Sequence, residues 1–139
     1  MSRLTFLSPH EAEVPGVPAL GKLEVRGGIP DGAIPIGPAR GLVVVDGDPR
    51  AERDRLTAAG YRVYDMTAAL VSLEVEGEQL MRRLTELDLD ALPAIGAVAR
   101  GTTAVIERLG PERFRLHVPQ ELSHYVADVI ADQTEGLAQ

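Results

Sequence analysis

The sequence predicts a mixed α+β domain in which helices cover one face of a mostly antiparallel sheet, with an extended arm before it. Three observations support this prediction. Apolar and polar residues alternate in several short segments, which is the pattern of half-buried strands. Other segments repeat their apolar residues at helical spacing. Six of the 10 prolines lie before position 42, so a mostly helical start is excluded.

The composition bounds the class of protein. The 139 residues are 45% hydrophobic and 25% charged, as in a globular domain that buries its core without cross-links. Cysteine is absent, which excludes disulfides, a thiolate nucleophile, Cys-ligated zinc and iron–sulfur clusters. A net charge of −7 argues against nucleic acid as a partner. Because no apolar run is long enough to span a bilayer and no signal core follows Met1, we expect no membrane contact and a cytoplasmic location.

After the arm, the expected elements follow in the order β-α-β-β-α-β-β-α, and two α/β units that share one sheet would bury their apolar faces most simply. Asp48 is expected to cap the first helix, with Pro49 at its first position and Gly60 at its end. The expected segments are a short strand over 22–26 inside the arm, a strand over 42–45, a helix over 49–60, strands over 61–65 and 71–76, a helix over 77–87, strands over 96–109 and 113–118 joined as a hairpin by 110–112, and a last helix from 119–120 that frays after 132.

The second half carries the clearest periodicity. Val71, Leu73 and Val75 alternate with polar residues, as in a strand with one solvated face. Apolar residues from Leu80 to Leu87 then follow at helical spacing. The expected parts of the chain are an extended N-terminal arm over 1–40, a single α/β domain over 41–133 and a frayed tail over 134–139.

Three histidines are available for acid–base chemistry: His10 in the arm, His117 in a strand and His124 near the start of the last helix. None of them lies at a metal-ligand spacing from another histidine or a carboxylate, so no metal site is expected. Ser123 beside His124 does not form a catalytic pair, because adjacent helical residues point about 100° apart. No glycine-rich nucleotide loop is present either.

Two Asp-x-Asp pairs could bind a cation or act as a base, or could simply cap turns. For Asp46 and Asp48, turn and cap chemistry is sufficient. Asp88 and Asp90 follow an amphipathic helix and alternate like a short extended segment. One of these two carboxylates is therefore expected to be drawn inward, with Arg100 as an available partner.

The order of these motifs resembles a known family. Tyr64-Asp65-Met66-Thr67, the strand after it and Asp88-Leu89-Asp90-Ala91-Leu92-Pro93 resemble the N-terminal region of the folate-binding aminomethyltransferases, which include the glycine cleavage T-protein. Residues 113–119, Arg-Phe-Arg-Leu-His-Val-Pro, and the following His-Tyr pair are more similar to the gamma subunits of heterotetrameric sarcosine oxidases. This resemblance covers about 40–132, and 14–27 resembles the N-terminal extension of those subunits. It implies a ferredoxin-like, T-protein N-terminal-like αβ sandwich.

The resemblance assigns places to two carboxylates. Asp88 takes the place of the T-protein's catalytic aspartate, which contacts folate in that family, and Asp65 takes the place of the acid in its Asp-Val-Ser element. Thr67 and Ala68 replace the serine and histidine of that element, and the hairpin motif that shapes the folate pocket is missing over 99–105. We therefore expect no catalytic residues, with Asp88 and Asp65 as vestigial positions and Asp88 as the candidate for folate contact.

The resemblance also implies a function. The chain would be a non-catalytic structural or assembly subunit of a sarcosine-oxidase-like complex that oxidises N-methyl amino acids and is linked to folate. It would bind no cofactor and have no enzymatic activity alone, because flavin, NAD and tetrahydrofolate would belong to the larger partner subunits. Two alternatives remain open: a stand-alone folate-binding or aminomethyl-transferring domain, and a homo-oligomeric domain whose arm swaps between copies.

Overall fold

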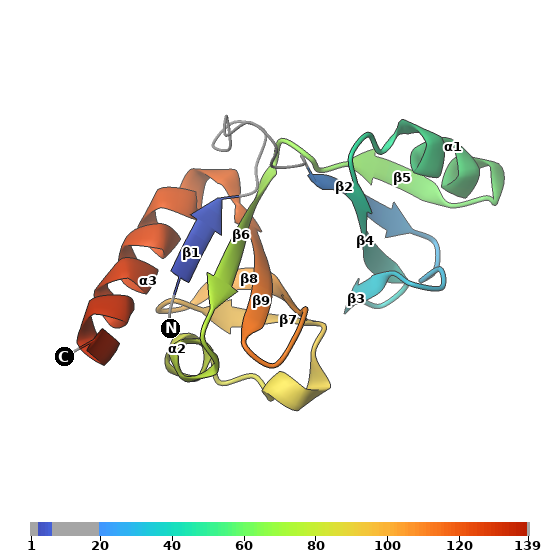
Figure 1. The fold of residues 1–139 in the computed structure, drawn as a ribbon. Helices are drawn as coiled ribbons and strands as arrows, with labels where there is room; N and C mark the ends of the chain where they lie inside the picture. Colours follow the sequence, from blue (N-terminus) through green and yellow to red (C-terminus); the bar gives the residue numbers. More distant parts are fainter. Residues whose placement is uncertain (1–2, 7–19, 139) are drawn as a thin grey trace. The chain divides into compact units, whose positions relative to one another are not determined.

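The computed structural model describes residues 3–6 and 20–138 and divides the chain into two compact units. Unit 1 comprises Met1–Phe6 and Val71–Gln139, and unit 2 comprises Leu7–Leu70. Unit 1 is built on a five-stranded sheet and unit 2 on a four-stranded sheet (Figure 1). The predicted α+β class with mostly antiparallel pairing is confirmed, whereas the expected single shared sheet is wrong.

The sheet of unit 1 has its strands in the order β1-β6-β9-β8-β7. Strand β1 pairs antiparallel with β6, and β8 pairs antiparallel with both β7 and β9. The strands are β1 (Arg3–Phe6), β6 (Leu70–Glu76), β7 (Ala94–Val98), β8 (Thr102–Arg108) and β9 (Arg113–Pro119). The helices of this unit are α2 (Glu78–Leu84) and α3 (Ser123–Ala138), with two short 3₁₀ turns, η1 (Leu89–Ala91) and η2 (Gln120–Leu122).

Helices α2 and α3 cover one face of this sheet and share its core. Alternate residues of the strands, such as Leu73, Ile106 and Leu116, are completely buried in one cluster with Met81 of α2 and Ile130 of α3. This packing follows from the sequence, because a strand turns every second side chain to the same face and a helix turns every third or fourth. The helices therefore lie on the face that the alternation makes apolar.

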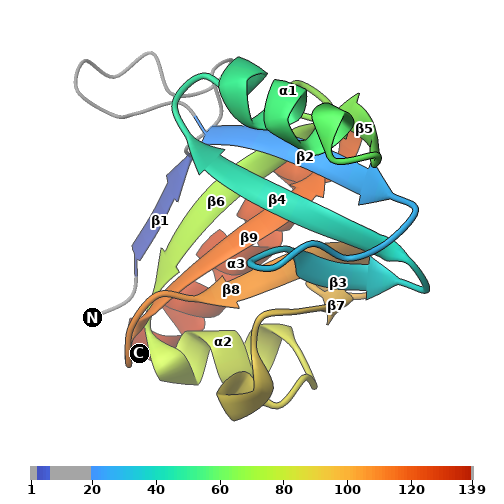
Figure 2. The same ribbon diagram turned by 90° about the vertical axis from the view of Figure 1, so that its right-hand side faces the viewer.

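Unit 2 has a smaller core. Its strands lie in the order β3-β4-β2-β5, and the pairs β2/β4, β2/β5 and β3/β4 are all antiparallel. Helix α1 packs beside β5 (Figure 2). Its Leu56 is buried in one cluster with Leu23 and Val25 of β2. The elements of this unit are β2 (Leu20–Arg26), β3 (Ile34–Gly37), β4 (Arg40–Asp46), α1 (Arg50–Ala58) and β5 (Arg62–Asp65).

The residues before position 41 differ from the expected arm. The short strand expected over 22–26 is confirmed, but it is an interior strand of a sheet, flanked by β4 and β5. Prolines and glycines here make the turns between strands: Gly27 and Gly32 have positive φ, and Pro35 lies on an edge strand that tolerates a missing N–H. Residues 7–19, which include His10, lie outside the described part of the chain.

Several boundaries also differ. The strand expected over 96–109 is two strands, β7 and β8, joined by a tight turn at 99–101. Helix α1 begins at Arg50, although the carboxylate of Asp48 does accept the Arg50 N–H at 3.0 Å. The tail expected to fray is helical to Ala138, because Leu137 packs against the core of unit 1. The hairpin that joins β8 and β9 lies where it was predicted.

Candidate functional site

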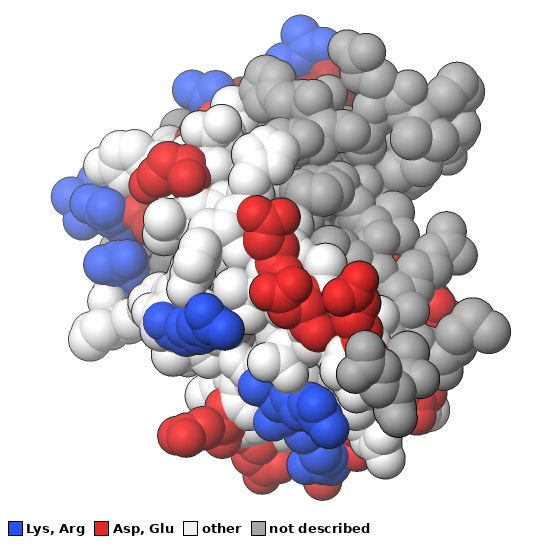
Figure 3. Space-filling view, turned by 90° about the vertical axis from the view of Figure 1, so that its left-hand side faces the viewer, with Lys and Arg blue, Asp and Glu red and all other residues white. Residues whose placement is uncertain are grey.

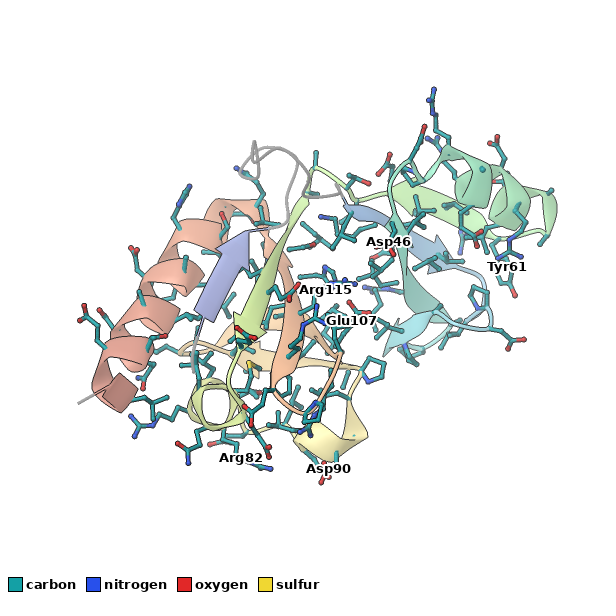
Figure 4. The ribbon with its side chains drawn as sticks, in the orientation of Figure 1. Asp46, Tyr61, Arg82, Asp90, Glu107 and Arg115 are labelled. Atoms are coloured by element: carbon teal, nitrogen blue, oxygen red, sulfur yellow. The ribbon has the colours of Figure 1, made fainter. Side chains whose placement is uncertain are left out.

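Four polar side chains form a row across the sheet of unit 1, on the face opposite α2 and α3. We call Ser72 on β6, His117 and Arg115 on β9, and Glu107 on β8 the polar row. Ser72 Oγ lies 2.7 Å from His117 Nδ1, and His117 Nε2 lies 2.8 Å from a carboxylate oxygen of Glu107. Arg115 Nη1 approaches the same oxygen at 3.5 Å, and Figure 4 shows Glu107 and Arg115 close together. Three neighbouring strands thus supply one hydrogen-bonded chain.

The chemistry of the polar row fixes the direction of one hydrogen bond. An ionised carboxylate only accepts, so His117 Nε2–H donates to Glu107 and leaves Nδ1 facing the hydroxyl of Ser72. Burial acts to raise the pKa of Glu107, but the hydrogen bond and charge of His117, together with Arg115, hold it below its usual value. Among the described residues, the Nε–H of Arg115 is buried and has no hydrogen-bond partner.

The polar row has the composition of a nucleophile, a base and an orienting acid. Ser72 is 0% exposed and His117 is 1% exposed in this structure. We interpret the polar row as a hydrogen-bonded network that links three neighbouring strands through their side chains.

Asp88 lies elsewhere in unit 1 and has a local partner. Its exposed carboxylate accepts the N–H of Asp90 at 3.0 Å and caps the 3₁₀ turn η1. The residue drawn inward is Leu89, which is 1% exposed, because the turn replaces the expected alternation. Asp90 remains exposed and pairs with Arg108 at 3.1 Å. The expectation of an inward carboxylate is therefore wrong, and so is the expectation of Arg100 as its partner.

Asp65 belongs to unit 2 and also serves a turn. It is exposed at the end of β5, and one of its oxygens accepts the Thr67 N–H at 2.9 Å. Hydrogen bonds from Thr67 lower the pKa of Asp65, with smaller contributions from the charges of Arg53 and Lys22. The structure therefore places both family-derived positions, Asp65 and Asp88, in turns of different units.

Lys22 is the only lysine of the chain, and it organises the segment after β5. Its N–H donates to Thr67 Oγ1 at 3.1 Å, its carbonyl accepts the Met66 N–H at 2.8 Å, and its Nζ donates to the Leu70 carbonyl at 2.5 Å. The residue is 0% exposed. Burial lowers the pKa of Lys22 to about 8, although the charge of Asp65 acts to raise it.

The lowered pKa of Lys22 predicts that the folded chain becomes more stable as the pH rises above 8. Between pH 8 and 10.5, the unfolded chain keeps the proton on Lys22 while the folded chain releases it. The unfolded state then binds more protons, so the free energy of unfolding should increase with pH, by up to about 1.4 kcal/mol per pH unit from this group. Urea unfolding at pH 7.5 to 10 measures the slope.

The matched variant is Lys22→Met, which keeps the length of the side chain and removes its proton. The difference in unfolding free energy between the wild type and Lys22→Met should shift in favour of the wild type as the pH rises from 8. Parallel pH curves for the two proteins would contradict the assignment of this slope to Lys22.

The sequence predicts a strand at His117 but gives no indication of the polar row. Ser72 and Glu107 are distant in sequence, and only the strand order brings them to either side of the same imidazole. The one available signal was the alternation of each strand, which put all three residues on the face without core residues. Within residues 3–6 and 20–138, no three His, Asp or Glu side chains are grouped as a metal site requires. Nor does any helix in this part of the chain have the length and apolar character to span a membrane.

Comparison with known proteins gives one kind of match. No family model and no curated protein matches the sequence. The structure is similar to a chain of heterotetrameric sarcosine oxidase from Corynebacterium sp. U-96, solved in complex with pyrrole 2-carboxylate, with a TM-score of 0.75. The two chains are 14% identical, and the similarity covers 99% of this chain and 86% of that chain. At this identity the similarity shows a common fold.

Proposed function

We propose that this chain is a non-catalytic structural subunit of a sarcosine-oxidase-like complex, corresponding to the gamma subunit. The observation that carries the proposal is the fold shared with a chain of heterotetrameric sarcosine oxidase over 99% of the present chain. The resemblance of residues 113–119 to gamma subunits points to the same complex. In this proposal the larger subunits hold flavin, NAD and tetrahydrofolate and carry out the oxidation.

The state of the family-derived residues supports a structural role. Asp88 caps η1 and Asp65 accepts a hydrogen bond from Thr67, so each carboxylate is engaged in a turn of its own segment. Ser72 and His117 of the polar row are buried. These features are what we expect of a non-catalytic subunit.

Co-expression with the large sarcosine-oxidase subunits of the same organism tests the proposal. We expect the tagged chain to co-purify with them at 1:1 stoichiometry through size-exclusion chromatography. Oxidase activity should reside in the complex and be absent from the isolated chain. Recovery of the chain as a free species that never co-elutes with the large subunits would refute the proposal.

Tetrahydrofolate separates this proposal from a stand-alone folate-binding domain. Titration calorimetry of the isolated chain should give no saturable heat, and Asp88→Asn should leave the turnover of the complex unchanged. Asparagine caps a turn as well as aspartate does, so this variant should also fold normally. Saturable binding to the isolated chain that Asp88→Asn abolishes would instead establish a folate site on this chain.

A further inference from the structure

A cavity of about 600 Å³ opens on unit 1 between the C-terminal half of α2 and the turn that joins β7 to β8. This volume lies within the range of small-molecule sites. Three arginines line the cavity, and Figure 4 shows one of them, Arg82, projecting beyond α2. The residues that line it are Arg82, Arg83, Leu84, Thr85, Glu86 and Leu87 from one segment, and Ala97, Val98, Arg100 and Gly101 from the other.

Hydrogen bonds join the two segments that line the cavity. Thr85 forms a bridge with Val98, its hydroxyl donates to the Ala97 carbonyl at 2.8 Å, and the same oxygen accepts the Leu87 N–H at 3.2 Å. The Ala99 N–H donates to the Leu84 carbonyl at 2.9 Å. These bonds hold the floor of the cavity in place before any ligand arrives.

A glycine on β7 also shapes the wall. A Cβ atom at Gly96 would lie 2.6 Å from a methyl carbon of Leu87, so only glycine lets Leu87 pack this closely on the strand. Leu87 and the buried Leu84 give the cavity an apolar side. The arginines give it a cationic side.

The turn over 99–101 contains residues that are unfavourable for its backbone conformation. Ala99 and Arg100 have φ values of 44° and 67°, the left-handed region, and the Gly101 N–H closes the turn on the Val98 carbonyl at 3.0 Å. A turn with two such central residues favours Asn-Gly. An arginine in this position costs local stability, and residues held against local preference concentrate at binding sites.

Positively charged residues predominate around the cavity, whereas the chain as a whole is negatively charged. Acidic residues outnumber lysine and arginine by 21 to 14, and Figure 3 shows acidic side chains gathered together on the side of the molecule where α3 lies. The residues that line the cavity include three arginines and one carboxylate, that of Glu86. Arg82 pairs with Glu78 at 2.6 Å, whereas no ion pair of Arg83 or Arg100 occurs among the described residues.

The C-terminus of α2 explains only part of this excess. Cations in the last turn of a helix are stabilised by its dipole, which accounts for Arg82 and Arg83. Arg100 lies on another segment, at a position where glycine would be more stable. The helix dipole does not account for Arg100, whereas a guanidinium that complements an anion would.

We propose that this cavity binds a small organic anion, with its carboxylate or phosphate group on Arg100, the positive charge of Arg83 adding to the attraction, and its apolar part on Leu84 and Leu87. The guanidinium fork matches the oxygens of both groups, so the two anion classes share one recognition chemistry. The proposal concerns unit 1 by itself and does not depend on membership of a complex.

NMR titration of the ¹⁵N-labelled full chain with matched probes tests the site. Benzoate and phenyl phosphate carry the same ring with a carboxylate or a phosphate group, and benzamide is the neutral control. We expect saturable shifts confined to residues 82–87 and 97–101 for at least one anion, and binding of benzamide at least tenfold weaker. The tighter of the two anions identifies the class. Absence of saturation for both anions, or equal binding of benzamide, would overturn the proposal.

The decisive variant is Arg100→Gly, because it should bind less well while folding better. We expect at least a tenfold loss of anion affinity together with a rise in Tm of about 3 °C, since glycine relieves the left-handed backbone. Arg83→Gln should also weaken binding, and Arg53→Gln, which changes an exposed arginine of α1, should leave the affinity within twofold. Unchanged affinity in Arg100→Gly would refute the role of this arginine.

Discussion

Replacing His117 with leucine is expected to lower the free energy of unfolding by about 3 kcal/mol at pH 7. The substitution keeps the bulk of the side chain but removes both hydrogen bonds of the imidazole. Ser72 Oγ then loses its 2.7 Å partner, and the carboxylate of Glu107 loses its 2.8 Å partner. A buried polar group that loses a hydrogen bond is less well compensated for its desolvation. Urea unfolding followed by circular dichroism gives the difference.

The same experiment should depend on pH in a defined direction. Partners in the folded chain hold the pKa of Glu107 below its unfolded value of 4.5. The stability that follows from this shift is present above pH 4.5 and is lost as the pH falls through the lower, folded pKa. The difference in unfolding free energy between the wild type and His117→Leu should therefore become smaller in acid, because a protonated Glu107 needs no cationic partner.

A control on the same sheet face separates the buried network from a surface ion pair. Glu74 and Arg113 pair at 2.9 Å, with side chains that are 26% and 53% exposed. Glu74→Gln should change the unfolding free energy by less than about 0.5 kcal/mol, because water screens this pair. An equally small effect of His117→Leu would show that the polar row does not hold the strands together.

Leu56→Ala is expected to destabilise unit 2 by about 3 kcal/mol. Leu56 is the only buried residue of α1, and with Leu23 and Val25 it forms the fully buried core between this helix and β2. So small a core has few side chains that could move into the space left by a leucine. Hydrogen exchange should show a loss of protection over 50–58, while the amides of α3 keep theirs.

The control for this variant is Leu109→Ala, which removes the same atoms from a side chain that is 37% exposed. We expect it to cost about 0.5 kcal/mol, as surface substitutions do. Equal losses from the two variants would contradict the assignment of Leu56 to a core. Loss of protection in α3 as well would show that the two units unfold together.

Sequence alone predicted the elements whose signals are local. Val71, Leu73 and Val75 alternate because one face of β6 meets a core, and that period is visible without knowledge of the partner strands. The hairpin before Arg113 was equally accessible, since Gly-Pro-Glu can hardly continue a strand. Local chemistry therefore determined the class of fold.

Pairing between strands was not accessible in the same way. Leu23 and Val25 mark a strand, but nothing nearby indicates that β4 and β5 flank it, so the sequence predicts an extended arm there. The polar row could not be predicted from the sequence for the same reason, because Ser72 and His117 are 45 residues apart. At Leu89 a 3₁₀ turn overrode the alternation on which the expectation of an inward carboxylate was based.

The pairing of β1 with β6 makes unit 1 discontinuous along the chain. Leu4 lies opposite Val75, and the whole of Leu7–Leu70 is inserted between these two halves of one sheet. During synthesis β1 is made first, but its partner β6 follows only some 70 residues later. The residues of unit 2 are therefore synthesised before the sheet of unit 1 can form. A fragment that starts at Val71 would leave one edge of β6 without its partner, and an unpaired edge is a template for aggregation. Unit 1 therefore needs β1 as well as the segment that begins at Val71.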